Sequence, residues 1–349
     1  MDAPRVSVVV PTHRRRDSLR RLLDALARQT LPPEAFEVVV AIDGSEDGTR
    51  ELVEAHAAPF RLRWLWQPQR GRAAACNAGA RLAAGALLVL LDDDMEPAPE
   101  WLAAHLAAHP PGSRRGVVGA APIPVGPGSP PVVAFRAAGF RRKLERLAER
   151  GGSLRFNEVY TGNFSVPREV FLEVGGFDEE FRLYGHEDYE MVLRMTRVGV
   201  DFRFDPAALA RQHYGKSFRA LAADILAEGE TAVLFARKHP EVVADLHLAG
   251  YARRSPRTRR RLGALLALSR AWGGFPSLVI SAVERLEPRR PAGLESWYRL
   301  VFDALYWLGV ERALAADGVP RKVGFHEIVG AVAPPGAGRA PARPASNSR

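Results

Sequence analysis

Cysteine is almost absent from this chain, and long apolar runs are missing. A single cysteine, Cys76, excludes an intramolecular disulfide framework and fits a reducing compartment. No run reaches the roughly eighteen apolar residues that indicate a membrane-spanning helix. Residues 1–5 lack the basic and then apolar pattern of a secretory signal. We therefore expect a cytoplasmic location.

Two phosphate-binding motifs are also missing from the N-terminal region, where nucleotide-binding folds usually carry them. Neither a GxxxxGK[ST] loop nor a GxGxxG turn follows the first predicted strand. A P-loop enzyme and a dinucleotide oxidoreductase are therefore disfavoured. A nucleotidyltransferase of related fold is a weaker alternative, because it would normally carry a glycine-rich, basic phosphate loop near its first strand.

The composition is that of a globular, basic protein. Hydrophobic residues make up 47% of the 349 residues, which is enough for one large domain with an appendage or for two domains. Lys and Arg outnumber Asp and Glu by 49 to 40, so the net charge is +9 at pH 7. This surplus favours anionic partners such as nucleotides or acidic lipids. We expect no nucleic-acid partner, because the aromatic signature of RNA-binding modules is missing.

Strand and helix patterns alternate along the first part of the chain. Apolar runs predict strands at residues 5–10, 37–42, 61–66 and 87–91. Helical spacing of apolar residues or alanine-rich composition predicts helices between them, at 17–29, 49–56 and 71–82. Strands that alternate with helices favour an α/β fold with a doubly wound, mostly parallel sheet.

Three consecutive carboxylates follow the last of these strands. Asp92, Asp93 and Asp94 come directly after the apolar run 87–91, which suits a strand that is buried on both faces. Ligands of open α/β sheets gather at the carboxyl ends of the strands. Adjacent acids repel one another unless a cation or water relieves the repulsion. The cluster therefore indicates either a metal site or a solvated acidic turn before the helix near Glu100.

A second group of acids opens a later predicted helix. Glu187 and Asp188 stand in its first turn, where backbone amides and the helix dipole favour the charged carboxylate. Such a carboxylate can act as a general base beside a substrate hydroxyl. The alternative is an ordinary pair of helix N-terminal acids. His213 follows a short predicted strand. A lone histidine in this position is more often a structural or surface residue than a metal ligand.

Five segments in a fixed order carry a resemblance to a known family. They are RVSVVVPTHR (5–14), VVVAIDGSEDGT (38–49), LLVLLDDDMEP (87–97), TGNFSVPREVFLEVGGF (161–177) and GHEDYEMVLR (185–194). Together they resemble the inverting family 2 glycosyltransferases with a GT-A fold, over about residues 5–215. The resemblance implies a hexosyltransferase-type enzyme that moves a sugar from a nucleotide diphosphate sugar to a glycan or lipid-linked acceptor hydroxyl. Cell-surface polysaccharide or glycolipid synthesis is the process that we expect it to serve.

The resemblance assigns donor-binding roles to five residues. Asp43 resembles the acid that hydrogen-bonds the nucleobase. Pro11 and Thr12 resemble the loop that lies beside the nucleotide. Asp92 and Asp93 belong to the acidic motif that contacts the nucleotide sugar.

The resemblance also implies a divalent cation and a base. Asp92 and Asp94 resemble the outer acids of the DxD motif, which would hold Mn²⁺ or Mg²⁺, with Asp94 as the more direct contact. His213 is similar to a histidine that some members use as a further metal or diphosphate contact. Asp188 resembles the base of the ED motif, which would take the proton of the acceptor during a single, inverting displacement.

Two positions depart from the pattern of the family. Ile42 stands where the common DDGS motif has its first acid, and the second acid, Asp43, remains. Cys76 stands where an arginine often precedes the asparagine of the third helix, here Asn77. The second departure removes a cation that would contact the base or phosphate, and residues 214–216 are one candidate replacement.

The chain divides into three predicted parts. Residues 1–240 form the GT-A domain, with a nucleotide-sugar half at about 1–120 and an acceptor half at about 121–240. Residues 241–330 form a helical extension, and residues 331–349 form a disordered tail. Basic clusters beside aromatic helices in the extension predict peripheral contact with an anionic inner membrane surface, or else packing on the catalytic domain or a second subunit. A non-enzymatic membrane-surface module is the alternative function.

Overall fold

The computed structural model describes residues 3–316, and these divide into two compact units. The first unit contains residues up to 183, together with 187–218 and 286–291. The second contains residues 184–186, 219–285 and 292–316. The predicted boundary at residue 240 lies after helix α8 (Phe218–Lys238), whereas the compact units divide at the start of that helix. The predicted disordered tail lies outside the described residues.

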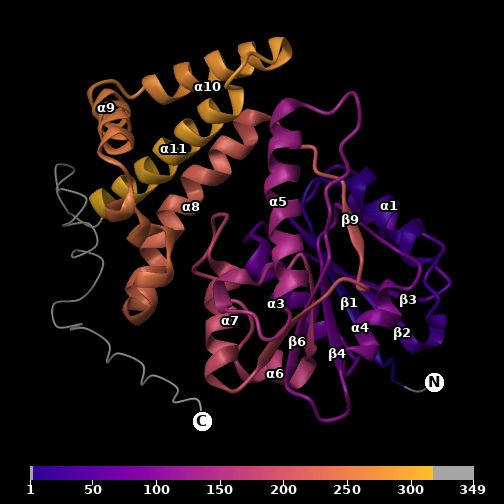
Figure 1. The fold of residues 1–349 in the computed structure, drawn as a ribbon. Helices are drawn as coiled ribbons and strands as arrows, with labels where there is room; N and C mark the ends of the chain where they lie inside the picture. The colour runs from indigo at the N-terminus through magenta and orange to yellow at the C-terminus, as the bar shows by residue number, and fades with distance from the viewer. Residues whose placement is uncertain (1–2, 317–349) are drawn as a thin grey trace. The chain divides into compact units, whose positions relative to one another are not determined.

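The first unit is built on a seven-stranded sheet of order β3-β2-β1-β4-β7-β6-β8 (Figure 1). Only β7 runs antiparallel to its neighbours, so the prediction of a mostly parallel α/β sheet is confirmed. The strands are β1 (Val6–Thr12), β2 (Phe36–Asp43), β3 (Arg61–Gln67), β4 (Leu87–Leu91), β6 (Arg115–Gly119), β7 (Asn163–Pro167) and β8 (Asp201–Asp205).

Helices cover both faces of this sheet, so successive residues of its central strands β1, β2 and β4 are all buried. Val8 and Val10 pack into the core that contains the leucines of α1, whereas Val9 packs into the core that contains Cys76 of α3. The helices and short 3₁₀ turns of this unit are α1 (Arg16–Leu26), α2 (Thr49–Ala55), α3 (Arg72–Leu82), α4 (Trp101–Ala107), α5 (Pro131–Arg150), α6 (Arg168–Glu173), α7 (Glu187–Arg197), η1 (Pro33–Ala35), η2 (Phe156–Glu158) and η5 (Glu287–Arg289).

A two-stranded sheet lies beyond the end of β4. It pairs β5 (Met95–Pro97) with β9 (Ala210–Gln212) in antiparallel register, so that Met95 lies opposite Gln212. The pairing brings a segment more than a hundred residues away in sequence to the end of the acidic run. His213 follows directly on β9.

The second unit is helical. Its elements are α8 (Phe218–Lys238), η3 (Pro240–Asp245), η4 (His247–Arg253), α9 (Pro256–Ala271), α10 (Phe275–Leu286) and α11 (Leu294–Ala316). Helices α8 and α11 approach closely at two glycines: a Cβ on Gly229 would lie 2.0 Å from the carbonyl oxygen of Tyr306, and one on Gly309 would lie 2.0 Å from that of Leu226.

The hydropathy of these helices bears on membrane contact. Among the described residues, no single helix combines the length and apolar character that crossing a membrane requires. Helices α9 and α10 meet these requirements only as a pair, and the pair is bent by 120°. The sequence Trp272-Gly273-Gly274 separates them, in the region where glycine and proline interrupt the apolar run.

Candidate active site

The candidate site lies at the carboxyl ends of β1, β2 and β4. These strands are parallel neighbours, so Thr12 at the end of β1, Asp43 at the end of β2 and Asp92 just after β4 share one edge of the sheet. The predicted donor residues Pro11 and Thr12 are both buried there. The topology therefore brings the N-terminal predicted residues to one edge.

Each of the three consecutive acids contacts an arginine. The guanidinium of Arg72 donates to Asp92 at 3.0 Å. That of Arg15 lies 3.1 Å from both Asp93 and Asp94. Asp93 also accepts a hydrogen bond of 2.7 Å from the hydroxyl of Thr12.

Burial controls the ionisation of two of these acids. It raises the pKa of Asp93 to about 7, although Arg15 and Thr12 favour the charged form. Burial also raises the pKa of Asp94, and the negative charge of Asp92 acts in the same direction, while Arg15 opposes both. The cluster is therefore poorly solvated and is stabilised by positive charge.

Arg72 connects this cluster with the second acidic group. Its guanidinium lies 3.3 Å from Oδ1 of Asp188 and 3.9 Å from Glu187, at the start of α7. It also donates to the hydroxyl of Thr161 at 3.0 Å. Thr161 in turn donates to Asp188 through its hydroxyl and, at 3.0 Å, through its backbone amide. One arginine and one threonine thus place Asp188 beside Asp92.

The segment Thr161-Gly162-Asn163 fits tightly against the acids. The amide of Asp92 donates to the carbonyl of Gly162 at 3.0 Å, and a Cβ on Gly162 would lie 2.4 Å from Oδ2 of Asp92. Asn163 fixes the segment from behind, because its amide group accepts from Trp101 and His105 and donates to two backbone carbonyls. The glycine is required here by the close approach of the carboxylate.

Asp43 closes the loop that precedes α3. Its carboxylate accepts hydrogen bonds of 2.8 to 2.9 Å from the side chain of Gln67 and from the backbone amides of Arg70 and Gly71. Since Arg72 is the next residue, these contacts also set the point from which its side chain extends. The contacts define a structural role, and the predicted nucleobase contact of Asp43 stays a prediction.

His213 lies near the acids without joining them. Its backbone amide donates to the carbonyl of Asp94 at 2.8 Å, while its Nε2 contacts Glu96 at 2.6 Å. The neighbouring Gln212 side chain reaches Asp94 at 3.4 Å. The Glu96 contact leaves Nδ1 as the remaining ring nitrogen of His213.

The donor set of the site fits a hard divalent cation. Mg²⁺ and Mn²⁺ prefer oxygen ligands, and in nucleotide sites Mg²⁺ typically uses one or two carboxylates together with substrate phosphates. Asp92 and Asp94 supply such carboxylates. Within residues 3–316, no group of three or more His, Cys, Asp or Glu side chains is arranged to hold an ion. The fit is therefore to a cation that a bound diphosphate would help to hold.

The arginines of the site were missed by sequence reasoning, although a signal existed. Arg15 is the N-cap of α1, and Arg72 is the first residue of α3, a helix with no acid in its first turn. A cation at a helix N-terminus opposes the helix dipole, so its presence indicates a nearby anion. Arg72 also lies one helical turn before Cys76, on the same face of α3.

Lys143 is a third cation that the sequence analysis did not single out. It lies on α5 with its ammonium group 5.1 Å from the ring centre of Tyr160. Burial lowers the pKa of Lys143 to about 8, and Arg136 acts in the same direction, while Asp188 opposes this shift. The ammonium group of Lys143 therefore lies within electrostatic range of Asp188.

Comparisons with known proteins agree with this geometry. The profile described as "Glycosyl transferase family 2" matches residues 7–161, and the one described as "N-terminal domain of galactosyltransferase" matches residues 142–216. Together the matched ranges contain both acidic clusters and Arg72.

Similar proteins and structures are glycosyltransferases. A validoxylamine A glucosyltransferase from Streptomyces hygroscopicus subsp. limoneus is 34% identical over 276 residues, which are 70% of this chain and 59% of the relative. One from subsp. jinggangensis is 33% identical over 276 residues, with 70% and 64% covered. The chain thus spans about three fifths of the length of these curated relatives.

A solved structure shares the fold. The mannosyltransferase PcManGT from Pyrobaculum calidifontis, solved in complex with GDP-Man and Mn²⁺, superposes with a TM-score of 0.61 at 22% identity, over 90% of this chain and 88% of that chain. This likeness agrees with the GT-A architecture expected from the sequence. The five segments and the matching profile identify residues 7–161 as a glycosyl transferase family 2 domain.

Proposed function

We propose that this protein transfers a sugar from a nucleotide diphosphate sugar to an acceptor hydroxyl, with inversion at the anomeric carbon. The observation that carries the proposal is the position of Arg72, which contacts Asp92 at 3.0 Å and Asp188 at 3.3 Å. Because one guanidinium contacts both carboxylates, Asp92 and Asp188 lie close together, which supports a site shared by the donor and the acceptor. Family membership supports sugar transfer over nucleotidyl transfer.

The donor would bind along the edge formed by Pro11, Thr12 and Asp43, with Asp92 and Asp93 facing its diphosphate side. Arg15 and Arg72 supply positive charge at this edge, and guanidinium groups bind phosphate oxygens through paired hydrogen bonds. The bound GDP-Man in the structure of PcManGT supports a nucleotide-sugar donor.

Asp92 and Asp94 are the residues that we propose hold Mn²⁺ or Mg²⁺, with His213 as a further contact. Such a cation, when bound, neutralises negative charge on the diphosphate. The Mn²⁺ in the complex of PcManGT supports a divalent metal. Burial and the negative charge of Asp92 raise the pKa of Asp94, and a bound cation would oppose both effects.

Asp188 is the general base of the proposed reaction. It takes the proton from the acceptor hydroxyl while the acceptor oxygen forms a bond to the anomeric carbon. The bond between that carbon and the diphosphate oxygen breaks, and the nucleoside diphosphate leaves with the electron pair. Because this is a single displacement from the opposite face, the configuration inverts. Thr161 holds the carboxylate in position through its two hydrogen bonds.

The acceptor that we propose is a glycan or a lipid-linked precursor, as in cell-surface polysaccharide or glycolipid synthesis, at a cytoplasmic site. Two curated relatives that transfer glucose support a hexosyl donor. Acceptor choice depends on segments beyond the donor edge, which include the irregular stretch 122–130 between β6 and α5.

The test compares the full chain with Asp188→Asn. Purified protein is incubated with nucleotide sugars, Mn²⁺ and an acceptor library, and products are followed by mass spectrometry and by NMR of the anomeric configuration. We expect Asp188→Asn to lower transfer by about 100- to 10,000-fold and to leave donor binding intact.

Glu51→Gln is a matched control, because Glu51 is an exposed acid in the first turn of α2. It should retain the full rate. A product of retained configuration, or full transfer by Asp188→Asn, would contradict the proposal.

A further inference from the structure

Helix α9 exposes an apolar stripe. Ala264, Ala267, Leu268 and Ala271 recur at helical spacing and are all exposed, and the side of the helix with Leu262 and Leu266 is buried. Leu268 is 49% exposed, and Trp272, directly after the helix, is 55% exposed. The helix therefore has one apolar side in the core of its unit and a second one open to solvent.

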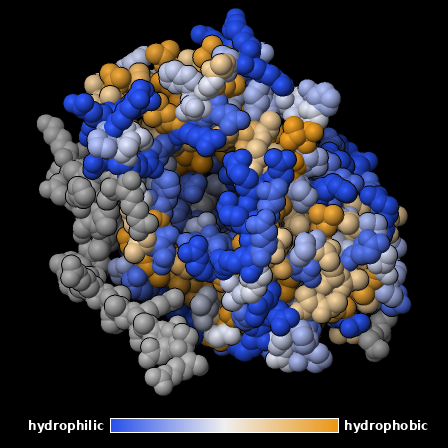
Figure 2. All heavy atoms as spheres, in the orientation of Figure 1, coloured by the Kyte–Doolittle hydropathy of each residue, from blue (hydrophilic) through white to orange (hydrophobic). Residues whose placement is uncertain are grey.

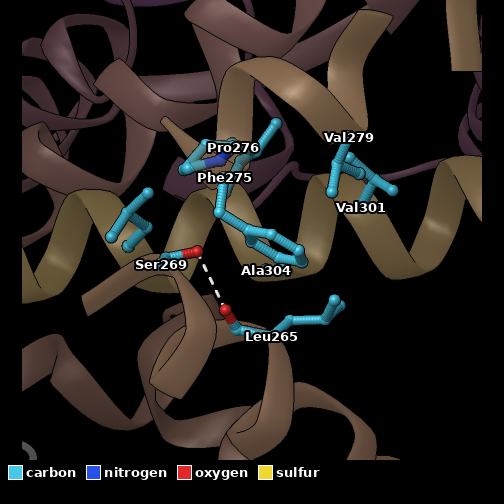
Figure 3. A pocket seen from close by; sticks show the side chains of 9 residues that line it. Leu265, Ser269, Phe275, Pro276, Val279, Val301 and Ala304 are labelled. Atoms are coloured by element: carbon cyan, nitrogen blue, oxygen red, sulfur yellow. Dashed lines mark hydrogen bonds between the residues drawn. The ribbon is translucent and has the colours of Figure 1, made fainter. Parts of the chain in front are cut away.

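The apolar exposure continues along the same unit. Leu278 on α10 is 51% exposed and Trp297 on α11 is 55% exposed. The unit also contains a small, open apolar pocket between α9, α10 and α11, with Phe275 and Val301 among its walls (Figure 3). The hydroxyl of Ser269 in this pocket already donates to a backbone carbonyl, so it is satisfied within the helix.

Positive charge is concentrated beside this apolar surface. Residues 253–290 contain ten arginines and two glutamates, so this short segment supplies +8 of the net +9 of the chain. Arg257, Arg260 and Arg261 are exposed and lie at helical spacing ahead of Ala264. One open face of α9 is therefore basic in its first half and apolar in its second. In Figure 2, hydrophobic and hydrophilic surface lie side by side over these helices.

From this combination we propose that α9 and α10 bind the surface of an anionic lipid bilayer. The arginines would contact lipid phosphates, and Leu268 and Trp272 would enter the boundary between headgroups and acyl chains. The bent pair suits a helix hairpin that lies on a membrane. A second copy of the chain would bring two arginine-rich faces together, which like charges oppose, and a nucleic acid would leave the apolar half without a partner.

The inference goes beyond sugar transfer, because the elements that carry it contain none of the proposed catalytic residues. Membrane binding would determine which acceptors the enzyme meets. A transferase held on an anionic membrane would act on acceptors at that surface, where lipid-linked hydroxyls are concentrated.

The experiment is flotation of the full chain with vesicles of phosphatidylcholine, with and without phosphatidylglycerol, at low and high salt. We expect binding only to the anionic vesicles and weakening by salt. The triple variant Arg257→Gln, Arg260→Gln, Arg261→Gln should bind on the order of 100-fold more weakly. The double variant Leu268→Ser, Trp272→Ser should also lose binding, because the salt-independent apolar contact is removed.

Matched controls come from exposed residues of the first unit. Leu172→Ser on α6 and the pair Arg20→Gln, Arg21→Gln on α1 remove the same side-chain types and should leave vesicle binding unchanged. Circular dichroism and the melting temperature verify that each variant folds. Donor binding, measured in solution, should be unaffected by the α9 variants, which separates this inference from the proposed activity.

Three results would overturn the inference. The first is equal binding to neutral and anionic vesicles, or no binding to either. The second is concentration-dependent dimerisation that the α9 variants abolish, with no vesicle binding, which would assign the face to a second copy. The third is tighter binding to a DNA or RNA duplex than to anionic vesicles.

Discussion

At the scale of single residues, the site depends on cations placed where helices usually carry anions. Arg15 and Arg72 stand at the N-termini of α1 and α3, against the direction of the helix dipole. The ion pairs with Asp92, Asp93 and Asp94 offset the unfavourable electrostatic energy of a positive charge at a helix N-terminus. The same geometry presents two guanidinium groups to any diphosphate that enters.

Arg72 should therefore be needed for both donor binding and catalysis. Arg72→Gln removes the ion pairs with Asp92 and Asp188. Removal of one partner of a buried, hydrogen-bonded charge pair typically costs about 2 to 5 kcal/mol of interaction free energy. Arg72 is only 27% exposed in its side chain, so solvent screening is limited. We expect kcat/KM to fall by at least 10-fold and Arg72→Lys to recover part of it. Steady-state kinetics at saturating acceptor provide the measurement.

Arg70→Gln is the matched control for this change. Arg70 lies in the same loop, but its side chain is 60% exposed and pairs with Glu179, while its backbone amide alone contacts Asp43. Its replacement should leave kcat/KM within about twofold, since exposed ion pairs contribute little. Equal losses in the two variants would show that Arg72 acts only by supporting the loop.

At the scale of elements, the strands and the start of α7 could be predicted because each depends on local pattern. The apolar run 87–91 of β4 indicated burial on both faces, and the structure shows a core on each face of that strand. The glycines after Ala271 interrupt the apolar run, and the two helices on either side are bent by 120° relative to each other. Contacts such as Arg72 with Asp188 could not be predicted, because they join elements far apart in sequence and depend on the direction of long side chains.

The link between α4 and β7 predicts a pH dependence of stability. His105 of α4 is fully buried and contacts Asn163 and Ser165 of β7, and burial lowers its pKa from 6.5 to about 4. His109 also contacts Ser165, and burial together with the nearby His105 lowers its pKa to about 4. Between pH 6.5 and 4 the unfolded chain therefore binds more protons than the folded one, so stability is lost as the pH falls.

At pH 5 the loss from His105 is about 2 kcal/mol. Thermal melts at pH 7.5 and pH 5.0 measure it. His105→Gln should lower the melting temperature at pH 7.5, because it disturbs a buried hydrogen-bond network, and it should also make the decline toward pH 5.0 shallower. Parallel declines in the variant and the unmodified protein would show that this histidine does not carry the effect.

At the scale of the whole molecule, the net positive charge is concentrated away from the acidic site in the sequence. Asp93 and Asp94 of the first unit are buried, whereas most of the net positive charge lies in residues 253–290. Donor binding and surface binding therefore depend on different parts of the chain. Ligands that bind only the folded state raise its melting temperature by mass action, so binding at the acidic edge can be measured on the intact protein.

Thermal melting therefore tests, in one experiment, which nucleotide the protein binds and whether binding requires a divalent cation. The protein is melted with UDP, GDP, dTDP or CMP, each with and without Mn²⁺. A diphosphate at 100 times its Kd should stabilise the folded state by about 2.7 kcal/mol, and we expect the shift to require Mn²⁺. Asp94→Ala should lose the Mn²⁺-dependent part of this shift, because it removes a proposed cation ligand, whereas Asp24→Ala on the exposed face of α1 should keep it. If one diphosphate gives the same shift with and without Mn²⁺ in both variants, the arginines bind the donor without a cation, and the role of Asp94 lies in holding Arg15.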